Sequence, residues 1–437
     1  MRNNLAPFRV ATLLLWVISN IILPHILADD AEEILSAKPL QQPEQWQNDL
    51  VNWLISKPNG YFSDKVLWTK TEMGYNMHAA EDIPKDTTLM IIPQAALITS
   101  DGTDEECITI SKMMKEYEKG EASEFYPYIR YLFGGHEGGT STGLLPTTWS
   151  EPAKDLLKQM VGTDLYPQKF EKSQKRILVD CQQFIDRKEL ESMSKETAQK
   201  WQDAFIFWVS RSWSDKMVPI LDMINHRNGK WLNVESTTAH SGQDIRVYAL
   251  RDIKKGEQLW NTYNECLDED CNYGRIKYSY ITQHILMDYG FVEAYPRRFI
   301  FHVDAKGTDR NNKQFLVVEI DEDPEDPTKR TFEWHFRKPT DAQLHWIYNQ
   351  LSRLKDMEFT MEEGLKALPD GHEKDTILAF YLAYREAFQL AMVHKDDDVS
   401  DNTFYPELPD EHEEEHDHEH EEEHDEEDDE EEDGDEL

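Results

Sequence analysis

Two similar stretches on either side of a helix-rich segment constrain the fold more than any other feature of the sequence. HAAEDIPKDTTL (78–89) and YALRDIKKGEQL (248–259) share the pattern Ala-x-x-Asp-Ile-x-Lys-x-x-x-Leu. Each stretch is typical of a strand, a polar turn and the next strand, which together form a β corner. The chain therefore carries one β corner on each side of an insertion.

The rest of the chain follows the same division. Short alternating segments occupy Gly60 to Thr99 and return from Val218 to Tyr263, whereas helical periodicity covers about a hundred residues between them. Helical patterns also fill 341–354 and 374–395. We therefore predict an α+β fold in which short strands and hairpins are interrupted by a helical insertion and followed by a mostly helical C-terminal lobe.

The charge of the chain is strongly negative and concentrated at one end. Net charge is −40, but residues 410–437 hold 21 Asp and Glu and five His without any Lys or Arg. The remainder has 65 acidic and 46 basic residues, a net charge of −19. This balance excludes nucleic acid as the expected partner and favours a basic one. We interpret the tail as a solvated polyanion, with weak Ca²⁺ binding as the functional alternative.

Both ends of the chain resemble targeting signals. Two Arg precede an apolar stretch, Val10 to Leu23, and the small residue Ala28 follows, which is typical of a cleaved signal peptide. The last four residues, 434–437, are Gly-Asp-Glu-Leu and resemble a KDEL-type retrieval signal. The endoplasmic reticulum lumen is therefore the predicted location, without stable membrane insertion after cleavage. A type II anchor through residues 10–23 is the alternative.

The four cysteines suit an oxidising compartment. Cys107, Cys181, Cys266 and Cys271 allow three full pairings. A local disulfide between Cys266 and Cys271 fits their spacing better than zinc, because a tetrahedral site needs two further nearby ligands.

Two other stretches carry the residues expected to do chemistry. MVPILDMINHRNG (217–229) is an apolar run that ends on Asn225 and His226. In the second, GEQLWNTYNE (256–265), alternation places Tyr263 at the end of a strand. A helical run later ends in Asp288-Tyr289-Gly290-Phe291, where Gly290 would let the chain turn and present two aromatic rings.

These motifs, in this order, resemble a SET-domain methyltransferase. They are Gly74-x-Asn76, Ser210-Arg211, Asp222-Met223-Ile224-Asn225-His226, Gly256-Glu257 with Tyr263, and Tyr289-Gly290-Phe291. Over residues 50–395 the chain is most similar to the subgroup typified by the RuBisCO large-subunit lysine methyltransferase. That subgroup has a SET domain split by a helical insertion and followed by a helical substrate-binding lobe.

The resemblance implies S-adenosylmethionine as cofactor. Its expected contacts are Gly74 and Tyr75 in the first β corner, Arg211 on the methionine carboxylate, and Phe291 on the adenine; Asp222, Asn225 and His226 complete the set. Tyr263 would be the catalytic residue that orients amine and methyl group. Trp213 and Tyr289 would line the substrate channel. Methyl transfer to an amine needs no metal, and we predict no metal site.

The resemblance also implies a substrate. We expect a protein with an exposed lysine, because the aromatic Trp213 two positions after Arg211 suits an aliphatic ammonium. Histidine N-methylation within the same subgroup is one alternative. A catalytically inactive SET fold that serves as a lumenal binding or Ca²⁺-buffering protein is another.

Two positions depart from the family pattern. The family usually has Gly-x-Gly in the first motif and Tyr-Gly at the tyrosine, where this chain has Asn76 and Asn264. Asn tolerates a positive φ, so we expect both asparagines to keep the backbone shape of glycine.

The expected division of the chain follows from these motifs. It comprises a signal peptide (1–28), an N-terminal helix with the first part of the SET domain (29–105), the helical insertion (106–207), the second part of the SET domain (208–295), the helical lobe (296–395) and the acidic tail (396–437).

Overall fold

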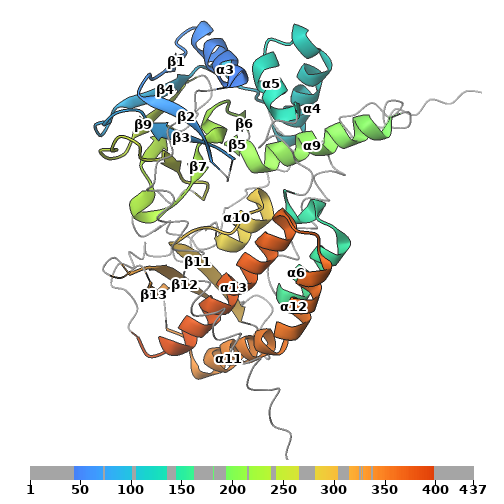
Figure 1. Cartoon of the computed structure of the whole chain (residues 1–437), viewed down its shortest axis with the longest axis vertical. Helices are drawn as coiled ribbons and strands as arrows, with labels where there is room; N and C mark the ends of the chain where they lie inside the picture. Colours follow the sequence, from blue (N-terminus) through green and yellow to red (C-terminus); the bar gives the residue numbers. More distant parts are fainter. Residues whose placement is uncertain are drawn as a thin grey trace, which may run out of the picture. The chain divides into compact units, whose positions relative to one another are not determined.

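The hydrophobic core built from buried residues between Trp46 and Leu259, the first core, contains strands from both sides of the insertion. The computed structural model describes residues 44–71, 74–100, 105–134, 144–161, 181, 193–213, 216–237, 243–264, 281–303, 314–323, 326, 328–335 and 338–397. An antiparallel sheet has the order β1 (Tyr61–Phe62), β4 (Thr88–Ile92), β9 (Ile245–Ala249) and β8 (Val234–Ser236). Its central pair, β4 and β9, therefore joins residues from the two halves of the sequence pattern (Figure 1).

The two predicted β corners pair with each other. Ile83 and Ile253 exchange backbone hydrogen bonds of 2.9 and 2.8 Å. The side chain of Asp82 accepts the N–H of Lys255 at 2.9 Å, and Asp252 accepts the N–H of Lys85 at 2.9 Å. The turn positions also match, because Asp86 has a φ of 63° and Gly256 a φ of 82°. The two stretches that share the sequence pattern therefore form one hydrogen-bonded pair of corners with equivalent contacts on both sides.

The β half, the part of the chain that contains this sheet, has further elements. Two hairpin strands, β2 (Val66–Thr71) and β3 (Gly74–Ala79), pair antiparallel. Helix α3 (Gln45–Ser56) contributes Trp46, Leu50 and Leu54 to the same core. A 3₁₀ turn, η2 (Gln94–Ala96), follows β4.

The insertion is helical where it is described. It contains α4 (Glu105–Glu118), α5 (Tyr126–Phe133), α6 (Glu151–Val161) and α9 (Lys195–Arg211), with the short 3₁₀ turns η3 (Gly120–Ala122) and η4 (Pro146–Thr148). A disulfide joins Cys107 in α4 to Cys181. Of the three full pairings, only the one that also joins Cys266 to Cys271 contains this disulfide. Those two cysteines lie outside the described residues, so their disulfide stays a prediction.

The apolar run before Asn225 is not one continuous strand, although the short alternating pattern that returns at Val218 is typical of strands. Only β6 (Lys216–Met217) is extended, and it pairs with β5 (Ser212–Trp213). The chain then enters a 3₁₀ turn, η6 (Leu221–Met223), after buried Ile220 with a φ of 72°. A positive φ is strained for a β-branched residue, and here it turns the chain into the next strand. That strand, β7 (Asn225–His226), pairs in parallel with β10 (Trp260–Asn261).

The C-terminal lobe contains a sheet that the sequence analysis missed. After α10 (Thr282–Tyr289), three antiparallel strands precede the helices: β11 (Arg297–Val303), β12 (Gln314–Glu322) and β13 (Arg330–His335). Helices α11 (Asp341–Asp356), α12 (Glu358–Ala367) and α13 (His372–Val393) follow. These strands and helices share a second core with α6. The prediction of helices at 341–354 and 374–395 is confirmed, and the lobe is mostly helical as predicted, although the sheet at its start was not expected.

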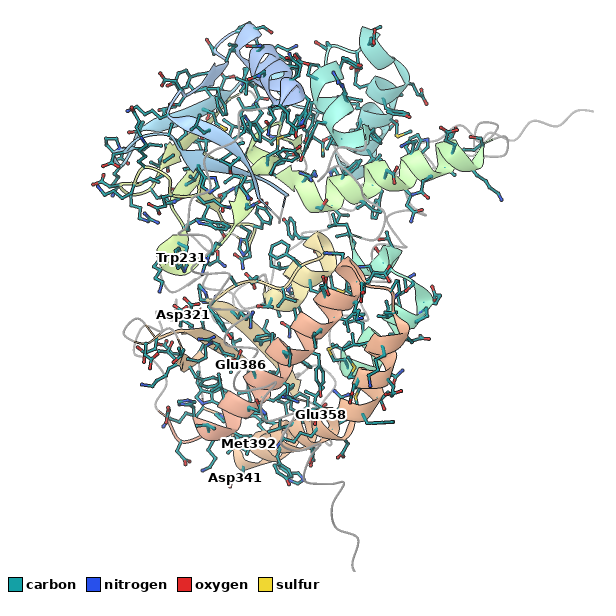
Figure 2. The ribbon with its side chains drawn as sticks, in the orientation of Figure 1. Trp231, Asp321, Asp341, Glu358, Glu386 and Met392 are labelled. Atoms are coloured by element: carbon teal, nitrogen blue, oxygen red, sulfur yellow. A yellow bond between two sulfur atoms is a disulfide. The ribbon has the colours of Figure 1, made fainter. Side chains whose placement is uncertain are left out.

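Glu386 fixes α13 on this sheet (Figure 2). Its carboxylate accepts the hydroxyl of Tyr295 at 2.6 Å and lies 3.6 and 3.8 Å from Arg297 and Arg330. Both guanidinium groups also lie over the Tyr295 ring, at 4.3 and 4.1 Å from its centroid. The segment that leads from α10 to β11 is therefore anchored at its C-terminal end.

Within the described ranges, no helix is long and apolar enough to cross a membrane.

Candidate cofactor and substrate site

Tyr263 is held at both its backbone and its phenol by the segment that contains β7. The pairing of β7 with β10 brings residue 263 beside His226, whose Nδ1 accepts the Tyr263 N–H at 2.9 Å. The phenol hydroxyl of Tyr263 donates to the carbonyl of Ile224 at 2.9 Å. These two bonds leave the ring little rotational freedom, so the phenol oxygen has a defined position.

Three rings surround this phenol. The Tyr263 ring lies 4.6 Å from that of Tyr289, 5.1 Å from His226 and 6.3 Å from Phe291. His226 and Phe291 are 6.0 Å apart. Tyr289 and Phe291, the two rings expected to be presented by the turn at Gly290, therefore both lie beside Tyr263.

Gly290 makes that approach geometrically feasible. It ends α10 in the left-handed region, with φ 77° and ψ 21°, and its N–H donates to Leu286 at 3.0 Å. A Cβ at this position would lie 2.1 Å from the carbonyl oxygen of Leu144. Only glycine therefore allows both the turn and the close approach of Leu144, which belongs to the insertion.

The side chains of Arg211 and Asp222 face inward. Their closest charged atoms are 3.7 Å apart, and Arg211 also donates to the backbone carbonyl of Asp222 at 3.2 Å. The second partner of Asp222 is the hydroxyl of Tyr128, at 2.8 Å. The Asp222 side chain is only 1% exposed, and its burial raises its pKa to about 6. The predicted cofactor contact of Asp222 would therefore act through Arg211.

The other predicted residues occupy different surroundings. Gly74 begins β3, and Tyr75 beside it packs edge-to-face on Trp46 at 5.2 Å and donates to Glu44 at 2.5 Å. Trp213 lies in β5 and packs against the first core. Across the described residues, no ring contact joins Trp213 to Tyr263, Tyr289 or Phe291, so its place in the channel wall stays a prediction.

Both asparagines that depart from the family pattern use their side chains. Neither Asn76 nor Asn264 has a positive φ, so the expectation that they imitate glycine is wrong. The amide oxygen of Asn76 accepts from Asn225 and, at 3.4 Å, from Gln258. Asn264 accepts the hydroxyl of Thr262 at 2.8 Å and the amide of Asn228 at 3.0 Å. Each asparagine therefore holds one side of the segment that contains Asn225 and His226.

Glu293 is the residue of the site that sequence reasoning missed. Its carboxylate lies 2.8 Å from Nε2 of His226, and both side chains are 2% exposed. A lone Glu just beyond Phe291 resembles a surface residue in the sequence. The sequence feature that could have identified Glu293 is its position two residues after the Tyr-Gly-Phe motif, which the resemblance already placed at the site.

The electrostatic surroundings keep Tyr263 protonated. Burial raises its pKa, and the nearby Arg211 opposes the rise only in part. A neutral phenol that donates its proton to Ile224 still offers oxygen lone pairs to a second donor. In the part of the chain that the structure describes, no group of three or more His, Cys, Asp or Glu could hold a metal ion.

Comparisons with known proteins match this region. The model of the SET domain matches residues 74–264. The N-lysine methyltransferase setd6 of Danio rerio is 24% identical over 286 residues, which cover 56% of this chain and 56% of that protein. The setd6 protein of Salmo salar is 26% identical over 281 residues, with 55% and 58% covered. The chain therefore spans little more than half the length of these curated relatives.

Solved structures resemble the chain more distantly. The structure of Rubisco LSMT bound to AdoMet has a TM-score of 0.49 and 14% identity, covering 81% of this chain and 94% of that one. Rubisco LSMT bound to Sinefungin and Monomethyllysine has a TM-score of 0.47 and 13% identity, with the same coverage.

Proposed function

We propose that the chain, whose residues 74–264 match the SET domain, is an S-adenosylmethionine-dependent protein-lysine N-methyltransferase of the secretory pathway. The observation that carries the proposal is the fixed phenol of Tyr263 among the rings of Tyr289, Phe291 and His226. Except for Tyr289 and Phe291, these groups lie inside the range that matches the SET domain.

The residues present fit a cofactor that carries an adenine, a carboxylate and a sulfonium. Phe291 is partly exposed and offers an apolar face beside His226. Arg211 offers a guanidinium whose side chain is 14% exposed, and such a group pairs well with a carboxylate. When bound, the cofactor supplies an electrophilic methyl group on sulfur.

The protein would contribute position and a suitable environment. An attacking amine must lose its proton, because only the neutral form has a lone pair, and burial among aromatic rings favours that form. The Tyr263 oxygen, with its own proton on Ile224, can accept an N–H from the amine and so orient its lone pair. Bound S-adenosylmethionine would supply the methyl group, and the rings of Tyr263 and Tyr289 would stabilise the positive charge that forms on the amine nitrogen.

The nature of the partner and the location rest on charge and on the chain ends. Without its tail the chain has a net charge of −19, so a basic protein with an exposed lysine is the expected substrate. Residues 1–28 and 434–437 support entry into, and retrieval to, the endoplasmic reticulum.

Calorimetry tests the proposal first. Protein that lacks residues 1–28 should bind S-adenosylmethionine saturably, and an absence of saturation at millimolar cofactor contradicts the methyltransferase assignment and favours an inactive binding protein. Mass spectrometry of lumenal proteins, with and without this chain, then identifies the substrate. Loss of methyl-lysine supports the proposal, whereas loss of methyl-histidine alone assigns the chain to histidine methylation.

A further inference from the structure

We infer that Glu293 is a positioning residue that sets the tautomer of His226 and thereby fixes Tyr263. Its effect on turnover rests on the proposed function, but its effect on His226 and on the Tyr263 backbone does not. A row of hydrogen bonds runs from Arg298 in β11 to Tyr263, the second residue after β10.

The tautomer of His226 follows from its two neighbours. A backbone N–H can only donate, so Nδ1, which accepts the Tyr263 N–H at 2.9 Å, carries no proton. The proton of the neutral ring is therefore on Nε2, and it points at Glu293 Oε1, 2.8 Å away. A carboxylate can only accept, so Glu293 selects the same tautomer that Tyr263 requires.

Glu293 itself is surrounded by donors. Besides His226, Oε1 lies 3.2 Å from the amide nitrogen of Asn264 and 3.4 Å from that of Asn228. Oε2 accepts the hydroxyl of Thr282 at 2.6 Å. That hydroxyl is oriented, because its oxygen accepts the backbone N–H of Arg298 at 3.2 Å. Four donors that converge on one buried carboxylate provide the solvation that water would otherwise supply.

The same shell holds the residues on both sides of Tyr263. Asn264 donates to Glu293 and accepts from the hydroxyl of Thr262. His226 connects the same carboxylate to the backbone of Tyr263 itself. Three consecutive residues are therefore fixed relative to one acid that lies 30 positions later in the chain.

Removal of the carboxylate should release Tyr263. The Nε2–H of His226 would be buried without an acceptor, and such a group gains a partner by changing tautomer or rotating. In either case Nδ1 no longer accepts the Tyr263 N–H. The phenol would then lose its defined place at Ile224, and a displacement of about 1 Å at a reacting group can lower a rate about 10²-fold.

Three variants isolate this effect. Glu293→Ala removes the acceptor. Glu293→Gln keeps one oxygen for His226, while its amide can donate to the oxygen of Thr282. Glu373→Ala is the matched control, because Glu373 also accepts two hydrogen bonds, from the backbone and hydroxyl of Ser150, at 3.0 and 2.7 Å, but belongs to α13.

Two readouts need no activity. Histidine side-chain NMR of the full chain should place the His226 proton on Nε2 in the wild type, and a proton on Nδ1 overturns the inference whether or not any variant folds. Amide hydrogen exchange at Tyr263 should become about 2- to 10-fold faster in Glu293→Ala, the factor that one hydrogen bond provides. Exchange should stay near the wild-type rate in Glu293→Gln and Glu373→Ala.

A third readout connects the network to turnover. Glu293→Ala should lower kcat about 10²-fold while the affinity for S-adenosylmethionine changes little, and Glu293→Gln should restore most of the rate. Faster exchange with an unchanged kcat overturns the positioning role. If the wild type neither binds the cofactor nor methylates, the proposed function fails, and the NMR and exchange results still decide the role of Glu293 in the structure.

Discussion

Replacement of Gly290 by alanine should destabilise the protein through two separable effects. The first is the backbone conformation, because a left-handed φ of 77° costs a residue with a Cβ about 1 to 2 kcal/mol. The second is contact, since the new Cβ would lie 2.1 Å from the oxygen and 2.9 Å from the carbon of the Leu144 carbonyl. Backbone atoms cannot change rotamer, so overpacking adds about 1 to 3 kcal/mol.

Gly256→Ala is the matched control. Gly256 has a similar φ, 82°, but no atom lies within 4 Å of the place that a Cβ would take. It should therefore cost only the conformational part, reduced by up to about 1 kcal/mol because alanine also restricts the unfolded chain. The same reduction applies to Gly290→Ala, so we expect a loss of about 1 to 5 kcal/mol for it and about 0 to 2 kcal/mol for the control.

Urea unfolding followed by tryptophan fluorescence measures both losses, with equal m-values as the sign that the unfolded states are comparable. Equal destabilisation by the two substitutions would refute the reasoning, because it would mean that Leu144 does not approach Gly290. Gly290→Ala should also weaken cofactor binding, since Phe291 follows directly, whereas Gly256→Ala should not.

Four further predictions concern the site and the chain end. Tyr263→Phe removes the hydroxyl that bonds Ile224, and it should lower turnover about 10²-fold or more in a single-turnover assay while cofactor affinity persists; an unchanged rate would make the hydroxyl structural. Arg211→Ala should weaken S-adenosylmethionine binding by about 1.5 to 3 kcal/mol by calorimetry, and an unaltered affinity would leave Arg211 only as the partner of Asp222. Burial lowers the pKa of His78 to about 4, below its unfolded value, so the unfolded chain binds the proton at a higher pH than the folded chain does. The free energy of unfolding should therefore decrease as pH falls from about 6.5 to 4. Thermal unfolding of His78→Gln should show a smaller decrease than the wild type across this pH range. Deletion of residues 434–437 should send the protein into the culture medium on immunoblots, and retention of the truncated chain would rule out retrieval by this sequence.

Much of the fold was predictable because local patterns and backbone constraints agreed. The repeated Asp-Ile-x-Lys pattern identified two corners, and the helical period identified the insertion and α13. Gly290 was predictable as a turn because few residues other than glycine adopt its φ. The SET-family resemblance is confirmed by the match to residues 74–264.

The missed features depend on neighbours that the sequence does not reveal. Strands β11 to β13 alternate well enough, but the strong helical periods that follow them dominated the interpretation of the lobe. The role of Asn264 could not be predicted from φ preferences, because it comes from bonds to Asn228 and Glu293, which are distant in sequence. The positive φ of Ile220 likewise has no local signal, since tertiary packing imposes it against the preference of the residue.

The paired β corners also determine when the protein can fold during its synthesis. Strand β4 is complete at Ile92, but its partner β9 begins only at Ile245. At about 5 to 20 residues per second, a ribosome needs roughly 8 to 30 s to make the intervening stretch of about 150 residues. Throughout that interval the β4 edge and the Ile83 corner have no permanent partner, so the nascent chain exposes an open strand to any other chain nearby. The β half therefore completes its sheet late in synthesis. The yield of folded protein in the cell should depend on chaperones that cover the β4 edge until the second corner is made.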